Sequence, residues 1–249
     1  MRVDIITLFP EMVAEVFKHS ILKRASEKNL IDIVVTNPRD FTYDKHHIVD
    51  DTPFGGGTGM VMKIDPIFRT VQSIKDENFC NNTRTILLCP RGNKFDQEKA
   101  KELAQYEQII LICGHYEGID ERVQNIIDES ISIGDYVLTG GEIPAMAITD
   151  AVARMIPGVL GSDNSAKEDS FFEGCLKYPQ YTRPREFNGW EVPEILISGD
   201  HAKIDRWRRK EALKVTLKIR PDLLQNLDLS KEDKEILQEI LAEEGEDNK

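Results

Sequence analysis

The chain is organised around the stretch Ser132-Ile133-Gly134-Asp135-Tyr136-Val137-Leu138-Thr139-Gly140-Gly141-Glu142. An apolar run leads into it and Ile143-Pro144-Ala145 follows, so we predict a strand that ends in a tight turn and opens a helix. The pair Gly140-Gly141 permits positive φ angles and a close approach of the backbone to a ligand. The first turn of the helix adds unpaired N–H groups. The pattern suits a small-ligand site, but a plain strand-to-helix turn has the same sequence.

The segments before this stretch indicate a mostly parallel sheet. Apolar runs predict strands at residues 3–9, 31–35, 85–89 and 108–113. Apolar residues at helical spacing lie between them, which is typical of an α/β fold with helices on both faces of the sheet. The first strand turns through Phe9-Pro10-Glu11-Met12 without a glycine, so the sequence lacks the dinucleotide-binding fingerprint.

Three of the predicted strands end in glycine-containing loops, at residues 90–92, 114–118 and 134–141. Ligands of open α/β sheets bind outside the carboxyl ends of the strands. We therefore expect the three loops to converge on one pocket, and this is the site that the residues alone predict.

Composition describes an ordinary globular protein of one large domain or two smaller ones, with 249 residues, 40% hydrophobic and 31% charged. The net charge of −12 does not favour a nucleic-acid binder. Residues 201–220, however, carry eight Lys or Arg against two acids. A basic segment in an acidic chain is a candidate electrostatic footprint for RNA.

The four cysteines form no C-x-x-C pair, so we expect no zinc site. The N-terminus lacks a secretion signal, and no apolar run reaches membrane-spanning length. The sequence therefore predicts a cytoplasmic protein without a membrane partner.

A stretch of small and polar residues at 161–170 predicts a flexible linker, and the composition of the chain changes after it. Residues 202–219 predict a basic helix, and Ser230 is placed to cap a last amphipathic helix. The cations and aromatic residues of this part suit a phosphate-binding and base-stacking surface. They are Arg183, Arg185, Arg206, Arg208, Arg209 and Lys210, with Tyr181 and Trp190. The alternative is a solvated charged helix with Trp207 in the core.

A series of motifs, in order, resembles the bacterial tRNA (guanine-N1)-methyltransferase (TrmD) family of the SPOUT class. The resemblance covers nearly the whole chain and fades only near the C-terminus. The motifs are Phe9-Pro10-Glu11-Met12, Pro38-Arg39-Asp40, Val49-Asp50-Asp51 with Gly55-Gly56-Gly57-Thr58-Gly59-Met60, Cys113 to Arg122, Ser132 to Glu142, Ile156 to Gly161, Glu168 to Phe171, and Tyr181-Thr182-Arg183-Pro184.

This resemblance implies a fold that periodicity does not predict, because chains normally avoid knots. Residues 1–160 would form a catalytic domain with a deep trefoil knot that binds S-adenosylmethionine, and residues 171–249 a small helical tRNA-binding domain. The family is homodimeric, with its active site at the subunit interface. By motif, the cofactor-binding residues would be Pro90, Gly114, Tyr116, Glu117, Ile133, Gly134, Asp135, Tyr136, Val137, Leu138, Gly140, Gly141 and Pro144.

The implied reaction methylates ring nitrogen 1 of the guanosine immediately 3′ of the anticodon (position 37) in tRNA. By motif, Asp169 of the partner subunit would be the general base, and Arg154 would stabilise the charge that develops on the guanine oxygen. The sequence shows no dedicated metal cage, so a role for magnesium stays open. Two alternatives remain, a non-catalytic RNA-binding protein that keeps the fold and a SPOUT relative that modifies a ribose hydroxyl.

Overall fold

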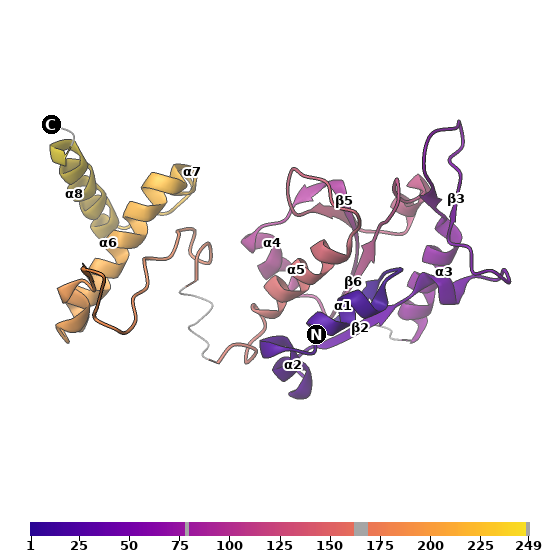
Figure 1. Ribbon diagram of the computed structural model, residues 1–249, viewed down its shortest axis with the longest axis horizontal. Coiled ribbons are helices and arrows are strands. Elements are labelled where there is room, and N and C mark those ends of the chain that lie inside the picture. Colours follow the sequence, from indigo (N-terminus) through magenta and orange to yellow (C-terminus); the bar gives the residue numbers. More distant parts are fainter. Residues whose placement is uncertain (78–79, 162–168, 248–249) are drawn as a thin grey trace. The chain divides into compact units, whose positions relative to one another are not determined.

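The computed structural model describes residues 1–77, 80–161 and 169–247. The chain divides into two compact units, Met1–Asp163 and Asn164–Lys249, and each is described by itself (Figure 1). The predicted linker at 161–170 lies, except for its two ends, outside the described residues.

A five-stranded parallel sheet forms the centre of the N-terminal unit, in the order β2-β1-β6-β5-β7. This confirms the predicted α/β fold with a mostly parallel sheet. The strands are β1 (Arg2–Ile6), β2 (Asp32–Thr36), β5 (Thr83–Lys94), β6 (Gln108–Cys113) and β7 (Glu129–Ser132). A short antiparallel pair, β3 (Asp50–Asp51) and β4 (Val61–Met62), lies outside this sheet.

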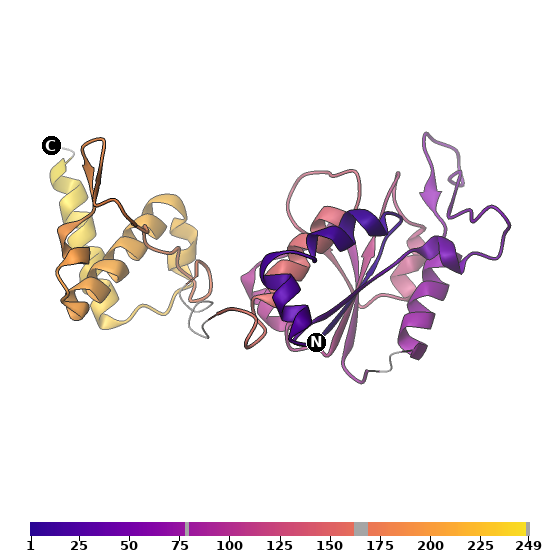
Figure 2. The same cartoon turned by 60° about the horizontal axis from the view of Figure 1, so that its bottom comes forward.

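Helices cover both faces of the sheet because successive strand residues point to opposite sides. In β6, Ile109 and Leu111 pack into one apolar cluster, whereas Ile110 and Ile112 pack into the other. The first cluster also holds buried residues of α1 (Pro10–Val16), α2 (Ser20–Glu27), α4 (Gln97–Leu103) and α5 (Glu142–Ala153), and the second those of α3 (Ile64–Glu77). Figure 2 shows the strands running between these two layers. Two short 3-10 helices, η1 (Pro38–Phe41) and η2 (Glu121–Asn125), complete the unit.

The strand predicted at residues 85–89 is wrong in length, because β5 continues through Pro90 and Gly92 to Lys94. Its pairing with β7 shifts register between Leu88 and Asn93. Proline and glycine predict a strand end from local sequence, but here they form an irregular section in the middle of a strand. The pairing of Asn93 with Ile131 then resumes the strand.

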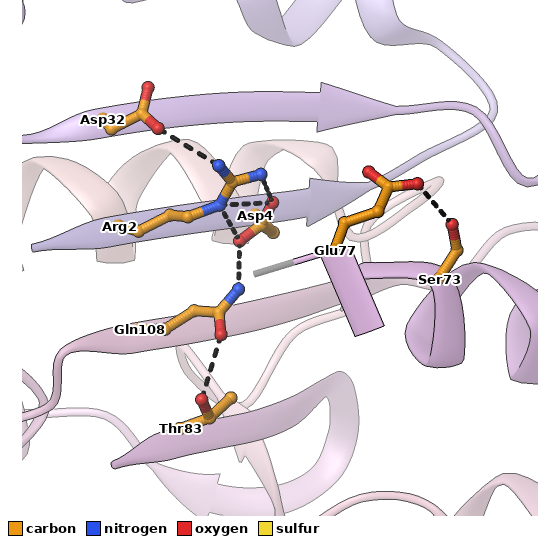
Figure 3. A network of polar contacts seen from close by, with 7 residues as sticks. All are labelled: Arg2, Asp4, Asp32, Ser73, Glu77, Thr83 and Gln108. Carbon is orange, nitrogen blue, oxygen red and sulfur yellow. Dashed lines mark hydrogen bonds and ion pairs between the residues drawn. The ribbon is translucent and has the colours of Figure 1, made fainter. Parts of the chain in front are cut away.

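A polar network crosses four strands near their amino ends (Figure 3). The fully buried Asp4 accepts hydrogen bonds from Arg2 Nη2 at 2.7 Å and from Gln108 Nε2 at 2.7 Å. Gln108 in turn accepts one from Thr83 Oγ1 at 2.9 Å, and Arg2 reaches Asp32 at 3.3 Å. Buried polar groups are stable only when they are paired, so this network fixes the alignment of β1, β2, β5 and β6.

The C-terminal unit is largely helical, with α6 packed on α8. Its small core holds Cys175, Leu213, Ile236 and Ile240. Ser230 Oγ accepts a hydrogen bond from the Asp233 backbone N–H at 3.0 Å, as expected for the predicted helix cap. The elements are β8 (Glu186–Phe187), β9 (Trp190–Glu191), η3 (Glu194–Ile197), α6 (His201–Ile219), α7 (Pro221–Gln225) and α8 (Lys231–Asp247). Among the described helices of the whole chain, none is long and apolar enough to cross a membrane.

Candidate active site

A cavity of about 350 Å³ lies where the glycine loops after β6 and β7 meet the irregular section of β5. Its volume is within the usual range for small-molecule sites, roughly 300–1,000 Å³. The structure thus brings together the three loops that the sequence predicted to converge. Twelve of the thirteen predicted cofactor-binding residues line the cavity: Pro90, Gly114, Tyr116, Glu117, Ile133, Gly134, Tyr136, Val137, Leu138, Gly140, Gly141 and Pro144. The thirteenth, Asp135, is exposed and is not part of the lining.

Other lining residues were not predicted. Leu87, Leu88 and Ile131 are buried and supply an apolar wall from the part of β5 just before its irregular section and from β7, and Val123 of η2 adds to it. The sequence signal for Leu87, Leu88 and Ile131 was their position near the carboxyl end of a predicted strand. Arg91 and His115 also line the cavity, inside loops that the sequence had already singled out.

The turn at Gly140-Gly141 is fixed directly against the end of β6. The backbone N–H of Gly141 donates to the carbonyl oxygen of Gly114 at 2.9 Å, and His115 pairs with Gly140 in an isolated bridge. A Cβ atom on Gly141 would lie 2.6 Å from Cα of Cys113, so no larger residue fits there without a backbone shift. Close backbone approach therefore explains this glycine.

A buried carboxylate stands behind the same turn. Glu142, the first residue of α5, is only 4% exposed, and its Oε1 accepts a hydrogen bond from Thr7 Oγ1 at 2.7 Å. Burial raises the pKa of the Cys113 thiol, and the charge of Glu142 adds to this effect. The cysteine is therefore an unreactive thiol, and Glu142 joins the end of β1 to the start of α5.

Gly134 has a different role, because its φ of +152° is one that residues with side chains rarely adopt. A Cβ atom there would also lie 2.5 Å from the ring of Tyr136. The loop can therefore fold the Tyr136 ring back over residue 134, and this ring and Val137, both exposed, form one edge of the cavity mouth.

Two other lining residues carry charge. Arg91 Nη2 lies 2.6 Å from Glu121 Oε2 of η2, and the hydrogen bond between them raises the pKa of Arg91. Glu117 lies against Gly59 of the glycine-rich loop, and its backbone N–H donates to the Met60 carbonyl oxygen at 3.1 Å. The long loop before β4 is thus attached to the rim of the cavity.

This set of groups fits an S-adenosylmethionine molecule. The inner walls are apolar, the loops expose backbone polar groups, and the charged side chains lie at the mouth. The nucleoside of this cofactor carries no phosphate, in agreement with the missing phosphate-binding glycine fingerprint. Among the described residues, no group of three or more His, Cys, Asp or Glu is placed to hold a metal ion.

The two predicted catalytic residues do not line this cavity. Arg154 is the C-cap of α5, whereas Pro144, in the first turn of that helix, lines the cavity. Ten residues of helix separate them, which corresponds to about 15 Å along its axis. Asp169 belongs to the C-terminal unit, where its carboxylate lies 3.5 Å from Lys177 Nζ.

Most cations of the basic segment, residues 201–220, are already paired with acidic side chains, so fewer are available to RNA than the sequence indicates. Arg206, Arg209 and Lys210 of α6 pair with acidic residues of α8, and the hydrogen bonds from Arg209 lower the pKa of Asp233 to about 2. Three more of the eight cations pair with nearby acids. Within the described residues, that leaves Lys214 and Lys218 without an ion pair.

The predicted stacking residues differ in exposure. Trp190 is 72% exposed and lies beside Phe187, at a ring-centre distance of 6.2 Å. Trp207 is half-buried and lies 6.4 Å from the ring of Tyr181, so it is neither a core residue nor a fully open one.

Comparison with known proteins supports the motif resemblance. The family model described as "tRNA (Guanine-1)-methyltransferase TrmD" matches residues 1–226. A protein of Desulforamulus reducens is 58% identical over 241 residues, covering 96% of this chain and 95% of its own length. One from Dictyoglomus turgidum is 58% identical over 243 residues, or 98% of each chain. One from Dehalococcoides mccartyi strain 195 is 54% identical over 246 residues, or 98% of this chain and 99% of its own. All three carry the name tRNA (guanine-N(1)-)-methyltransferase. A family match over most of the chain and identities above one half show that this protein belongs to the tRNA (guanine-1)-methyltransferase (TrmD) family.

Proposed function

We propose that this protein transfers a methyl group from S-adenosylmethionine to ring nitrogen 1 of the guanosine immediately 3′ of the anticodon in tRNA. The observation that carries the proposal is the convergence of three glycine-containing loops on one cavity, in a member of this family. When bound, S-adenosylmethionine supplies an activated methyl group on a sulfonium. The tRNA substrate makes the cytoplasm the place of the reaction.

The chain's own residues supply the acid–base chemistry. Nitrogen 1 of guanine carries a proton and becomes nucleophilic when that proton leaves. Asp169 accepts the proton as general base. Negative charge then develops on the guanine oxygen, where the guanidinium of Arg154 stabilises it. The target base leaves its stack to reach the cavity, as in other enzymes that act on bases.

A homodimer completes the site in this proposal. Arg154 stands about 15 Å along α5 from Pro144 of the cavity lining, and in the proposed dimer the second copy supplies the catalytic residues for each cavity. Exposed apolar side chains offer a surface for that copy. Phe9, Met12 and Val16 lie on or beside α1, and Ile143 lies on the neighbouring α5; each is 41–50% exposed.

A trefoil knot is part of the proposed fold. β7 lies at the edge of the sheet, beyond β5, yet the turn after it returns to the end of β6. β7 itself lies so close to the irregular section of β5 that a Cβ atom on Gly92 would lie 2.5 Å from the carbonyl carbon of Ser130. These two close approaches support a chain that threads through the loop after β5.

The C-terminal unit binds tRNA in this proposal. Arg183, Lys214 and Lys218 have no ion pair within the described residues and can reach phosphates. The exposed Trp190 can stack on a base. Acidic residues of α8 pair with many of the other cations of α6, so tRNA binding depends on few cations.

One experiment tests the proposal. The protein is incubated with labelled S-adenosylmethionine and with tRNA transcripts that carry guanosine or adenosine 3′ of the anticodon. Methyl incorporation should require the guanosine, and guanosine-independent or absent incorporation would contradict the proposal. Asp169→Ala should abolish turnover and leave the dissociation constant of S-adenosylmethionine nearly unchanged. An equal loss of cofactor binding would show that Asp169 has a different role.

A further inference from the structure

The cavity mouth carries one feature that the proposed chemistry does not use. Among the described lining residues, the only guanidinium or ammonium group is that of Arg91, and the only carboxylate is that of Glu117. Arg91 is 68% exposed and lies at the irregular section of β5, next to the predicted cofactor residue Pro90. The other lining residues are uncharged apart from the imidazole of His115: they are mostly apolar side chains and glycines, with the hydroxyl groups of Tyr116, Ser132, Tyr136 and Thr139.

The cofactor has two chemically different ends. The adenine is flat and largely apolar, so it suits the buried walls formed by Leu88 and Ile131. The amino-acid end carries a carboxylate and an ammonium group, and burying either without a partner would cost several kcal/mol. The amino-acid end therefore belongs at the charged mouth, and the carboxylate needs a cation there.

We infer that Arg91 binds the α-carboxylate of S-adenosylmethionine and so sets the orientation and selectivity of the cavity for nucleosides that carry an amino-acid end. This inference rests on the proposed function, because it assumes that the cavity holds this cofactor. An arginine suits the task, since its planar guanidinium can donate two parallel hydrogen bonds to one carboxylate.

Glu121 competes for the same guanidinium. Its carboxylate lies 2.6 Å from Arg91 Nη2, but both side chains are about two-thirds exposed. Ion pairs of this kind contribute little to stability, so the ligand carboxylate can replace or join Glu121 at little cost.

The test compares two ligands that share a nucleoside and a neutral thioether. S-adenosylhomocysteine has the amino-acid end, and 5′-methylthioadenosine lacks it. Dissociation constants are measured by calorimetry for the full-length protein and for Arg91→Gln, Arg91→Lys and Glu121→Gln. Arg122→Gln is the matched control, because Arg122 is equally exposed and pairs with Asp120 at 2.6 Å, but it does not line the cavity.

Arg91→Gln should weaken S-adenosylhomocysteine about five- to tenfold and change 5′-methylthioadenosine by less than about twofold, as expected for loss of one exposed charged contact. Arg91→Lys should recover only part of the loss, because lysine keeps the charge but not the two parallel hydrogen bonds, and Arg122→Gln should match wild type with both ligands. Glu121→Gln should bind S-adenosylhomocysteine at least as tightly as wild type.

An equal loss for both ligands, or no loss for S-adenosylhomocysteine, would overturn the inference for Arg91. Weaker S-adenosylhomocysteine binding by Glu121→Gln would overturn it too, because it would assign the ligand contact to the carboxylate. A wild-type protein that binds neither ligand would instead refute the proposed function of the cavity.

Discussion

Gly92→Ala tests whether the close contact between β5 and β7 holds the N-terminal unit together. A Cβ atom at this position would lie 2.5 Å from the carbonyl carbon of Ser130 and 2.6 Å from that of Ile131, and closer still to the Ile131 nitrogen. Atoms of a backbone strand cannot rotate away as a side chain can. The methyl group must therefore push β7 and β5 apart.

The expected cost follows from the surroundings. Extra methyl groups in packed interiors cost about 1–3 kcal/mol, and Ile131 is only 1% exposed, so we expect a value near the upper end. In a domain of this size, each kcal/mol lowers the melting temperature by about 2–4 °C. Gly92→Ala should therefore lower the melting temperature of the N-terminal unit by about 6–12 °C. It should also weaken S-adenosylhomocysteine binding, because Pro90 and Arg91 line the cavity.

The assay is differential scanning calorimetry with far-UV circular dichroism. Gly161→Ala is the control, because a Cβ atom on Gly161 would meet nothing within 4 Å. It should melt like the wild type. If Gly92→Ala melted within about 1 °C of the wild type, the contact would not limit the packing of β5 on β7, and our account of the irregular section would be wrong.

Three further predictions concern stability and RNA binding. The pKa of Asp233 is lowered to about 2 by its ion pair with α6, so the pair should contribute about 2 kcal/mol above pH 4 and lose this as pH falls toward 2. Asp233→Asn should remove that pH dependence, as read from tryptophan fluorescence, since Trp190 and Trp207 both lie in the C-terminal unit. Asp4→Ala should lower the free energy of unfolding by about 3 kcal/mol in denaturant titrations, because it leaves buried donors unpaired. The control is Asp32→Ala at an exposed position, which should cost less than about 0.5 kcal/mol. Equal effects of the two substitutions would refute this prediction. The logarithm of tRNA affinity should fall with the logarithm of salt concentration with a slope of about −2 to −3, and a slope near −6 would mean that all eight cations of the basic segment reach phosphates.

Periodicity is enough to predict the sheet but not all of its edges. The apolar runs that become β1, β2 and β6 are short and bounded by turn residues, and the structure places strands there. The extension of β5 could not be predicted, because its last residues pair with Ile131 and Ser132, almost forty positions later in the chain. A contact between distant segments overrides the local preference of Pro90 and Gly92.

The cavity was predictable because its signals are local. Glycines at strand ends mark places where the backbone comes close to something, and parallel strands bring their carboxyl ends to one edge. The charge of the C-terminal unit was not predictable in the same way. Whether Arg209 faces RNA or Asp233 depends on how α6 packs on α8, and the sequence of either helix alone does not contain that information.

The helix α5 shows why a single chain does not explain the proposed reaction. Its first turn carries Pro144 at the cavity, and its end carries Arg154 about 15 Å away. Methyl transfer needs donor and acceptor in van der Waals contact, with the guanine oxygen two bonds from the attacked nitrogen. A rigid helix cannot bring its own two ends together, so in the proposed homodimer the cavity of one copy and Arg154 of the other form each site. The exposed apolar side chains of α1 and α5 then have a reason to be on the surface, because the same pairing that covers them would also assemble the catalytic groups.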